Sequence, residues 1–385
     1  MIDFPASPII GQTFTAAGVT WIWDGAKWLP NGLAPTVVPG INDNRIINGD
    51  MWVDQRNGGA SGTANAYTVD RWQYQSNQLS KGTWQRNGNT PAAPGGFPYG
   101  LVFSSASAFA SAATDYFQFS QAIEADMISD FQWGTASAQP VTLSFLAYTS
   151  QIGTFSGCLG NYAATRNYPF TYSIPVANTW TKIVITIPGD TTGTWPLAGN
   201  GGGAILHFDL GSGSNYRAAA NVWTSTGVVG ATGSVSVVGT NGAYLTLTGV
   251  KLEIGSVATP YNRQSLAKSM ADCQRYFCKT YLQSQTPGQA LTDDSALAVF
   301  TFEGGGTQYN DTTWSFPVTM RASATITLYS PHTGVSGKAW LQNSAADMAA
   351  APGNASDCTA TLTLSGVTTS ATDFAKFHAV ASAEL

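Results

Sequence analysis

The stretch "VTLSFLAY" (residues 141–148) alternates apolar and polar side chains with a period of two. Its apolar positions are Val141, Leu143, Phe145 and Ala147. Successive side chains of a β-strand point to opposite faces, so this pattern predicts a strand with one face in a core. The stretches "WTKIVITIP" (180–188) and "AILHFDL" (204–210) alternate in the same way. Together they predict an all-β fold.

A fourth stretch, "AYLTLTGVKLEI" (243–254), keeps this alternation until Gly249, where the apolar phase slips by one residue. Such a slip at a glycine predicts a β-bulge. Several short strands separated by Gly-rich loops favour a two-sheet sandwich of the jelly-roll type. The sequence shows no fixed-period repeat, which argues against a β-helix or a propeller.

Turn and linker signals divide the 385 residues into five segments. Asp24-Gly25 between alternating aromatics predicts an N-terminal hairpin, which is too small to be stable alone in water. The Pro- and Gly-containing stretch "GLAPTVVPGI" (32–41) is typical of a linker. We expect a hairpin module at 1–31, a linker at 32–41, a jelly roll at 42–258, a connecting helix at 259–285 and a small β-sandwich at 286–385.

The connecting segment is almost free of glycine and predicts an amphipathic helix over 260–282, with Thr259 as a possible N-cap. An apolar stripe recurs at helical spacing through Leu266, Met270, Cys273 and Phe277. A lone amphipathic helix must bury this stripe, either on its own sandwich or on another copy of the chain. The stripe is short for a coiled coil.

Composition excludes several classes of function. Charged residues make up only 10 % of the chain, the net charge is −5 and no Lys/Arg cluster occurs, so we expect no nucleic-acid partner. No apolar run is long enough to span a membrane, and no secretory signal is expected. Three scattered histidines and four cysteines without a CxxC pair predict no metal site, no cofactor and reduced thiols. The cysteines are Cys158, Cys273, Cys278 and Cys358.

Catalysis is also poorly supported by the sequence. A glycosidase needs two carboxylates that flank the scissile bond. The carboxylates that we consider as candidates for this role are Asp115, Glu124, Asp126, Asp130, Asp190 and Asp209. We interpret the group at 122–130 as a surface turn, and Asp209 with His207 as a solvated or hydrogen-bonded pair. Because no GxSxG, HExxH or P-loop motif occurs, we expect a protein that is not an enzyme.

Several stretches, in this order along the chain, resemble known proteins. The N-terminal part "FPASPIIGQTFTAAGVTWIWDGAKW" and the stretch "NRIINGDMWVDQRNGG…YTVDRW" (44–72) are similar to the short N-terminal module and to the start of the jelly roll in fibre and spike proteins of tailed phages. "LTGVKLEIGSVATPYNRQSLAKSMADCQRYFCKTY" (247–281) resembles the end of that domain and the helix after it. "FPVTMRASATITLYSPHTGVSG" (316–337) and "FHAVASAEL" resemble their tip domain. Gene transfer agents use similar proteins, and the sequence does not separate the two.

The resemblance implies a homotrimer on the surface of a virion or phage-like particle, made in the bacterial cytoplasm. It implies that the N-terminal module anchors to other virion proteins and that the jelly roll, which resembles carbohydrate-binding modules, attaches to host surface or capsular polysaccharide without cleaving it. In the trimer, the helix stripe would face the threefold axis. A purely structural connector and a polysaccharide depolymerase remain the alternatives.

Sugars stack on flat aromatic rings, and polar groups fix their orientation. Aromatic residues in Gly/Asn-rich loops are therefore candidate carbohydrate contacts, and two neighbouring arginines can pair with an acidic sugar. These candidates are Trp195, Tyr216, Trp223, Tyr162, Tyr168, Arg166 and Arg217. The alternative is that the rings pin long loops to the sandwich. Trp52, Trp72 and Trp180 are expected in the core.

In the C-terminal domain, Tyr329, His332 and Trp340 flank the loop "SPHTGVSGKAW". If this domain is the distal tip, these residues contact the receptor. They can equally lie at a contact between copies of the chain.

Overall fold

The computed structural model describes residues 4–6, 8, 12–16, 19–23, 28–30, 44–88, 91–290, 293–301, 308–367 and 373–385. The chain forms two compact units, Met1–Asp43 and Asn44–Leu385. In the first unit, β1 (Thr13–Ala16), β2 (Val19–Trp23) and β3 (Trp28–Pro30) form a three-stranded antiparallel sheet. The Asp24-Gly25 turn and the 32–41 linker lie outside the described residues.

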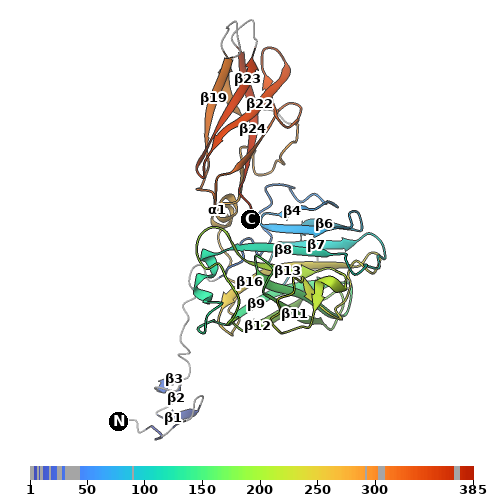
Figure 1. Cartoon of the computed structure of the whole chain (residues 1–385), viewed down its shortest axis with the longest axis vertical. Helices are drawn as coiled ribbons and strands as arrows, with labels where there is room; N and C mark the ends of the chain where they lie inside the picture. Colours follow the sequence, from blue (N-terminus) through green and yellow to red (C-terminus); the bar gives the residue numbers. More distant parts are fainter. Residues whose placement is uncertain are drawn as a thin grey trace. The chain divides into compact units, whose positions relative to one another are not determined.

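The second unit contains a sandwich of two antiparallel sheets, as Figure 1 shows. The six-stranded sheet has the order β11-β10-β13-β8-β5-β4. Its strands are β4 (Ala66–Val69), β5 (Trp72–Ser76), β8 (Phe117–Glu124), β10 (Gly153–Asn161), β11 (Asn167–Ile174) and β13 (Gly202–Asp209).

The five-stranded sheet has the order β12-β9-β16-β7-β6. Its strands are β6 (Gly82–Gly88), β7 (Tyr99–Ser105), β9 (Val141–Thr149), β12 (Thr181–Ile187) and β16 (Tyr244–Ile254). Smaller elements are the 3-10 turns η1 (Asp126–Phe131) and η2 (Ser214–Tyr216) and the parallel pair β14 (Arg217–Ala218) and β15 (Gly230–Ala231). The predicted all-β jelly-roll architecture is confirmed.

The core lies between the two sheets and is built from the alternating apolar positions. Phe145 of β9 meets Phe208 of β13 edge to face across the sandwich, with ring centroids 5.0 Å apart. Trp72 is fully buried, as predicted, whereas Trp52 and Trp180 remain partly exposed.

The predicted bulge in β16 is present. The register with β9 shifts between Thr248 and Lys251, and Gly249 between them has a φ of +62°. A Cβ at this glycine would lie 2.9 Å from the Phe97 ring. Both the backbone conformation and the close contact therefore require glycine here.

The predicted helix is real but much shorter than expected. Helix α1 runs only over Leu266–Gln274, and its N-cap is Ser265, whose hydroxyl accepts a hydrogen bond from Lys268 N. Thr259, the expected N-cap, instead donates its backbone N–H to Glu253 at 2.8 Å. The segment before the helix is therefore bound to β16 of the sandwich.

The C-terminal part of the helix prediction is wrong because a strand begins there. β17 (Phe277–Lys279) pairs with β24 (Asp373–Ser382), and this pairing satisfies the backbone groups that a longer helix would have used. Phe277 therefore does not share a helical stripe with Leu266. Cys273 and Phe277 are buried within the chain, whereas Leu266 is 44 % exposed.

The C-terminal sheet has eight strands and includes β17. Its path is β17-β24-β21-β22-β23-β19, and β18 and β20 also pair with β24. The remaining bounds are β18 (Leu297–Thr301), β19 (Gln308–Ser315), β20 (Thr325–Tyr329), β21 (Lys338–Leu341), β22 (Ala346–Ala355) and β23 (Thr359–Val367). Its own core includes Leu328, Phe377 and Ala381.

Buried charges join this sheet to the sandwich. Glu384, which follows β24, forms ion pairs with Arg71 and with Arg56, the latter at 2.8 Å. The Arg71 guanidinium also stacks on the Tyr276 ring, 3.5 Å from its centroid. Glu124 of β8 binds Arg275 at 2.7 Å. The two β structures therefore share a junction of paired charges.

We expect Glu384→Gln to lower the free energy of unfolding by about 3–5 kcal/mol, because it leaves the buried Arg71 guanidinium without its counter-charge. Urea denaturation measures this loss. The matched control is Asp272→Asn, which removes an exposed i,i+4 pair with Lys268 and should cost roughly 0.5 kcal/mol or less. Equal losses in the two variants would contradict a structural role for the junction.

The junction also predicts a pH dependence. Burial raises the pKa of Asp70 to about 6, although Arg56 and Gln55 oppose this. The stabilisation from protonated Asp70 is complete below pH 4 and is lost as the pH rises through 6. The free energy of unfolding of the wild type should therefore fall by about 3 kcal/mol relative to Asp70→Asn over this window. Urea titrations of both proteins at several pH values measure this difference. If the free energy of unfolding changes with pH in the same way in both, the prediction is refuted.

Candidate functional site

Four of the seven predicted carbohydrate contacts come together in one cluster. Trp195 packs edge to face against Trp133 and Trp223, with centroids 4.6 and 5.7 Å away, and Trp223 contacts Tyr168 at 5.2 Å. Arg166 lies over Trp223 at 5.9 Å. Trp195 and Tyr168 are buried, and Trp223 is partly exposed.

The polar atoms of this cluster bind one another. Asp190 accepts two hydrogen bonds from Arg166, at 2.8 and 2.7 Å, and one from Trp195 Nε1 at 3.0 Å. Burial opposes ionisation of Asp190, but these hydrogen bonds outweigh it and lower its pKa. Trp223 Nε1 donates to the Pro188 carbonyl at 3.0 Å. The arrangement favours the alternative that these rings pin loops to the sandwich.

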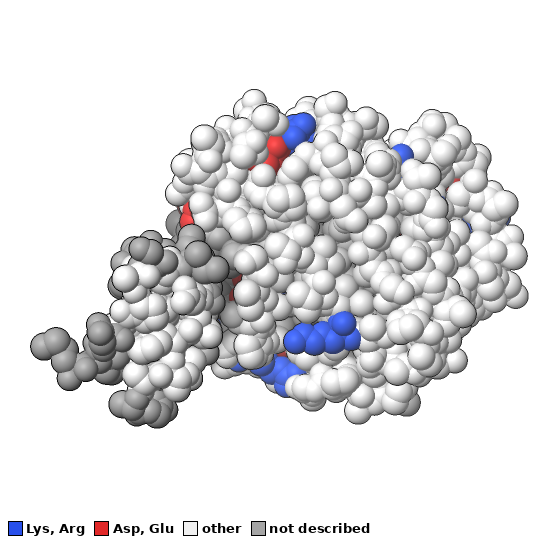
Figure 2. Space-filling view, turned by 90° about the horizontal axis from the view of Figure 1, so that it is seen from below, with Lys and Arg blue, Asp and Glu red and all other residues white. Residues whose placement is uncertain are grey.

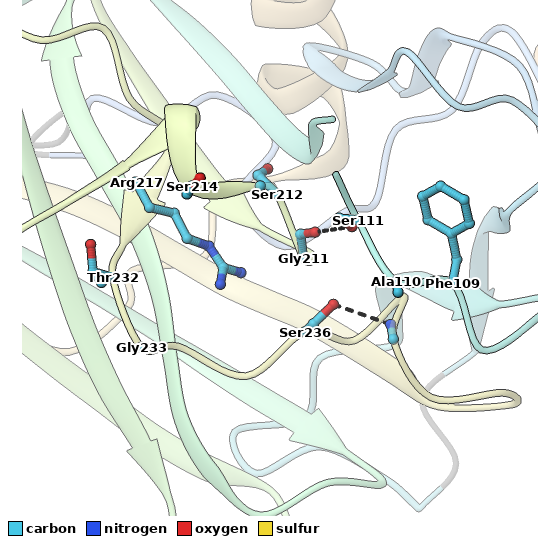
Figure 3. A pocket seen from close by; sticks show the side chains of 12 residues that line it. Phe109, Ala110, Ser111, Gly211, Ser212, Ser214, Arg217, Thr232, Gly233 and Ser236 are labelled. Carbon is cyan, nitrogen blue, oxygen red and sulfur yellow. Dashed lines mark hydrogen bonds between the residues drawn. The ribbon is translucent and has the colours of Figure 1, made fainter. Parts of the chain in front are cut away.

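Tyr216 and Arg217 lie elsewhere, and Arg217 lines the pocket of about 470 Å³ in Figure 3. The Arg217 guanidinium pairs with the buried Asp209 at 2.8 Å, and Tyr216 packs edge to face on Tyr116. Serine hydroxyls of this pocket are used internally, for example by Ser111, which donates to Gly211 O at 2.6 Å (Figure 3). Ser212 and Ser236 are engaged as well, by Phe117 O and by Gly239 N.

The seventh residue, Tyr162, is 43 % exposed and lines a groove of about 430 Å³ on the outer face of the six-stranded sheet. We call this the tyrosine groove. Its lining residues are Tyr67, Arg71, Gln73, Gln75, Ser120, Ala122, Tyr162, Ile205 and Leu385.

Strand register builds the floor of the groove. Gln73 of β5 lies between Tyr67 of β4 and Ser120 of β8, and Ala122 of β8 pairs with Ile205 of β13. The groove therefore crosses the strands. Because alternate side chains fill the core, these residues must face outward.

The floor offers polar groups that the protein itself does not use. Among the described residues, neither the Gln73 amide nor the Ser120 hydroxyl makes an internal hydrogen bond. Gln75 accepts a bond from Gln118 Nε2 at 2.8 Å, which leaves the Gln75 amide nitrogen free to donate. Free donors and acceptors in a groove are what a polar ligand needs.

The ionisable side chains around the groove are paired or uncharged at neutral pH. Burial lowers the pKa of His207, the neighbour of Ser120 on β13, to about 4, so its ring is uncharged at neutral pH. Arg71 is neutralised by Glu384. Burial raises the pKa of Tyr67 to about 12, and its hydroxyl donates to Leu385 O at 3.3 Å.

Charge is sparse on the outside as well. Figure 2 shows one face of the molecule, on which Lys, Arg, Asp and Glu occupy only a few small areas. Two tyrosine rings, amides and a hydroxyl, with no unpaired charged side chain beside them, suit a neutral, polyhydroxylated ligand, whose C–H faces stack on rings while its hydroxyls bind amides.

The predicted tip residues separate into two places. His332 stacks on Trp340 at 4.3 Å with nearly parallel planes, and His332 Nε2 lies 3.3 Å from Asp293. Tyr329 packs instead against Tyr281.

Most of the catalytic candidates are paired with other groups. Asp190 and Asp209 form ion pairs with Arg166 and Arg217, as described above. Glu124 pairs with Arg275, and Asp130 pairs with Arg45 at 2.5 Å. Asp115 accepts hydrogen bonds from neighbouring amides, whereas Asp126 is exposed.

Within the described ranges, no group of three or more metal-ligating side chains occurs. None of the helices among those residues is long and apolar enough to cross a membrane.

The sequence prediction missed most of the tyrosine groove. The available signal was the polar half of two alternating strands, Gln73 and Gln75 in "WQYQS" and Ser120 in "FQFSQAIE". Their juxtaposition depends on the pairing of β5 with β8, which the sequence alone did not reveal.

No protein-family model matches this chain, and no curated protein matches it. Among solved structures, it is similar to TmCBM61 in complex with β-1,4-galactotriose, with 11 % identity, a TM-score of 0.29 and coverage of 55 % of this chain and 99 % of that one. A putative sugar binding protein from Bacteroides thetaiotaomicron is 12 % identical, with a TM-score of 0.32 and coverage of 55 % and 100 %.

The enzymatically active domain of tailspike protein 4 from bacteriophage CBA120 is 13 % identical, with a TM-score of 0.31. That alignment covers 55 % of this chain and only 22 % of the tailspike chain.

Proposed function

We propose that the jelly roll binds a neutral segment of surface polysaccharide in the tyrosine groove and does not cleave it. The observation that carries this proposal is a set of polar groups without an internal partner, beside the rings of Tyr67 and Tyr162. They are the Gln73 amide, the Gln75 amide nitrogen and the Ser120 hydroxyl. Five of the six candidate catalytic carboxylates are engaged by other side chains or by backbone N–H groups, which supports binding over hydrolysis.

We further propose that the chain is a fibre or spike protein of a phage or phage-like particle and attaches the particle to its host. The ordered resemblance along the sequence supports this, and so does the separate compact N-terminal unit, which suits an anchor to another virion protein. A purely structural connector is the second candidate. It is favoured by the packing role of Trp195, which was expected to contact sugar.

We predict that Tyr162→Ala and Gln73→Ala each weaken binding to purified host surface polysaccharide roughly tenfold, a loss of ~1.4 kcal/mol. Tyr162→Ala removes a ring for stacking, and Gln73→Ala removes hydrogen bonds. Affinity electrophoresis measures both. Tyr216→Ala is the matched control, because this partly exposed tyrosine lies outside the groove.

If Tyr216→Ala loses binding and the groove variants do not, the binding site lies in the loops and not in the tyrosine groove. If no host polysaccharide retains the protein, a purely structural connector is favoured. Release of reducing ends by the wild type would show a depolymerase.

We also propose that the chain forms a homotrimer through α1, as the sequence resemblance implies. Leu266 on α1 is exposed, and Met270 one turn later is partly exposed, so both are free to contact other copies. Leu266→Asp should convert the trimer to monomers in light scattering, because it places a charge in an apolar contact. A trimer that survives this change would exclude α1 from the contact.

A further inference from the structure

The opposite face of the sandwich carries three aromatic rings in a row. Tyr148 lies on β9, Tyr244 on β16, and Trp180 directly before β12. The Tyr148 ring centroid is 5.3 Å from that of Trp180 and 5.8 Å from that of Tyr244. We call these three residues the aromatic row. All three are partly exposed.

Strand register explains why they meet. Thr181 pairs with Ala147, which places Trp180 opposite Tyr148, and Tyr148 pairs with Thr246, two residues beyond Tyr244. Ala147 is fully buried, so Tyr148 next to it must point outward. The aromatic row therefore lies on the outer face of the five-stranded sheet.

Hydrogen bonds hold two of the rings in place. Trp180 Nε1 donates to the Pro91 carbonyl at 2.9 Å, and the Tyr244 hydroxyl donates to Asn178 Oδ1 at 2.6 Å. A ring that is already fixed loses little conformational entropy when a ligand stacks on it, and such preorganisation favours binding.

The row lines a pocket of about 250 Å³ together with Val102 and three polar residues. These are Asn87, Ser104 and Thr246. In the part of the chain that the structure describes, their side chains make no internal hydrogen bond. None of the lining residues carries a charge. The pocket thus combines flat rings with free neutral polar groups.

This pocket and the tyrosine groove lie on opposite outer faces, because they belong to different sheets with the hydrophobic core between them. Ser120 in the groove follows Phe119, and Tyr148 in the row follows Ala147, and both preceding residues point into that core. The two sites share no lining residue, so both can be occupied at once.

We propose that the aromatic row is a second binding site, which stacks the apolar face of a neutral pyranose ring on Tyr148, Trp180 or Tyr244 and bonds its hydroxyls through Asn87, Ser104 and Thr246. One copy of the chain then binds two glycan segments, one on each face. The proposal shares only its ligand class with the proposed function. An apolar protein partner is disfavoured, because three uncommitted polar side chains would be buried without bonds.

The test labels the full chain with 5-fluorotryptophan and follows Trp180 by ¹⁹F NMR, with its resonance assigned through Trp180→Phe. Cellotetraose, xylotetraose and β-1,4-galactotetraose are titrated to about 10 mM, since one stacking contact gives millimolar affinity. At least one of them should shift the Trp180 signal saturably and leave the signal of Trp195, which is buried at another place, unchanged.

Tyr148→Ala should weaken this response at least tenfold, whereas Gln73→Ala in the tyrosine groove should leave it intact. The absence of a Trp180 shift with all three sugars would overturn the proposal, and so would a shift that persists unchanged in Tyr148→Ala.

These experiments test the two sites independently. If the groove variants lose polysaccharide binding and the Trp180 resonance does not shift, the second site is wrong and the proposed function stands. If Trp180 responds while the groove variants bind polysaccharide normally, the groove is wrong and the second site stands.

Discussion

Successive side chains of a strand point to opposite faces, and this alternation creates both the core and the two outer surfaces of the sandwich. Phe119, Phe145 and Phe208 occupy the inward positions and close the core. The same register forces Ser120 and Tyr148 outward, onto different sheets. A shift of one residue in β8 or β9 would turn these side chains into the core and core side chains outward, so packing and surface chemistry are fixed together.

The junction between the sandwich and the C-terminal sheet depends on electrostatics instead. Arg71 is buried, and Glu384 is its counter-charge. Removal of either charge alone therefore strongly lowers the free energy of unfolding. Arg71 and Leu385 also line one part of the tyrosine groove. The C-terminal residues thus contribute to a surface that otherwise belongs to the sandwich, and the groove is complete only when the junction is formed.

Local patterns predicted the strands, the bulge at Gly249 and the all-β class, because a two-residue period is readable from neighbours in the sequence. The helix bounds failed since the partner of β17 is β24, about a hundred residues away. The site was only partly predictable for a similar reason. Tyr162 was identified from its loop, but Gln73 and Ser120 become neighbours only through strand pairing. The sequence suggested that Trp195 and Arg166 contact a ligand, but both donate hydrogen bonds to Asp190 instead.

The central claim is that a glycan lies across the tyrosine groove. The most direct measurement is ¹⁵N NMR of the side-chain amides of Gln73 and Gln75, assigned with Gln→Glu variants, during titration with oligosaccharides from host surface polysaccharide. We expect saturable shifts of both amides with a shared dissociation constant. Shifts confined to the indole signals of Trp223 and Trp195, with both glutamine amides unchanged, would contradict it.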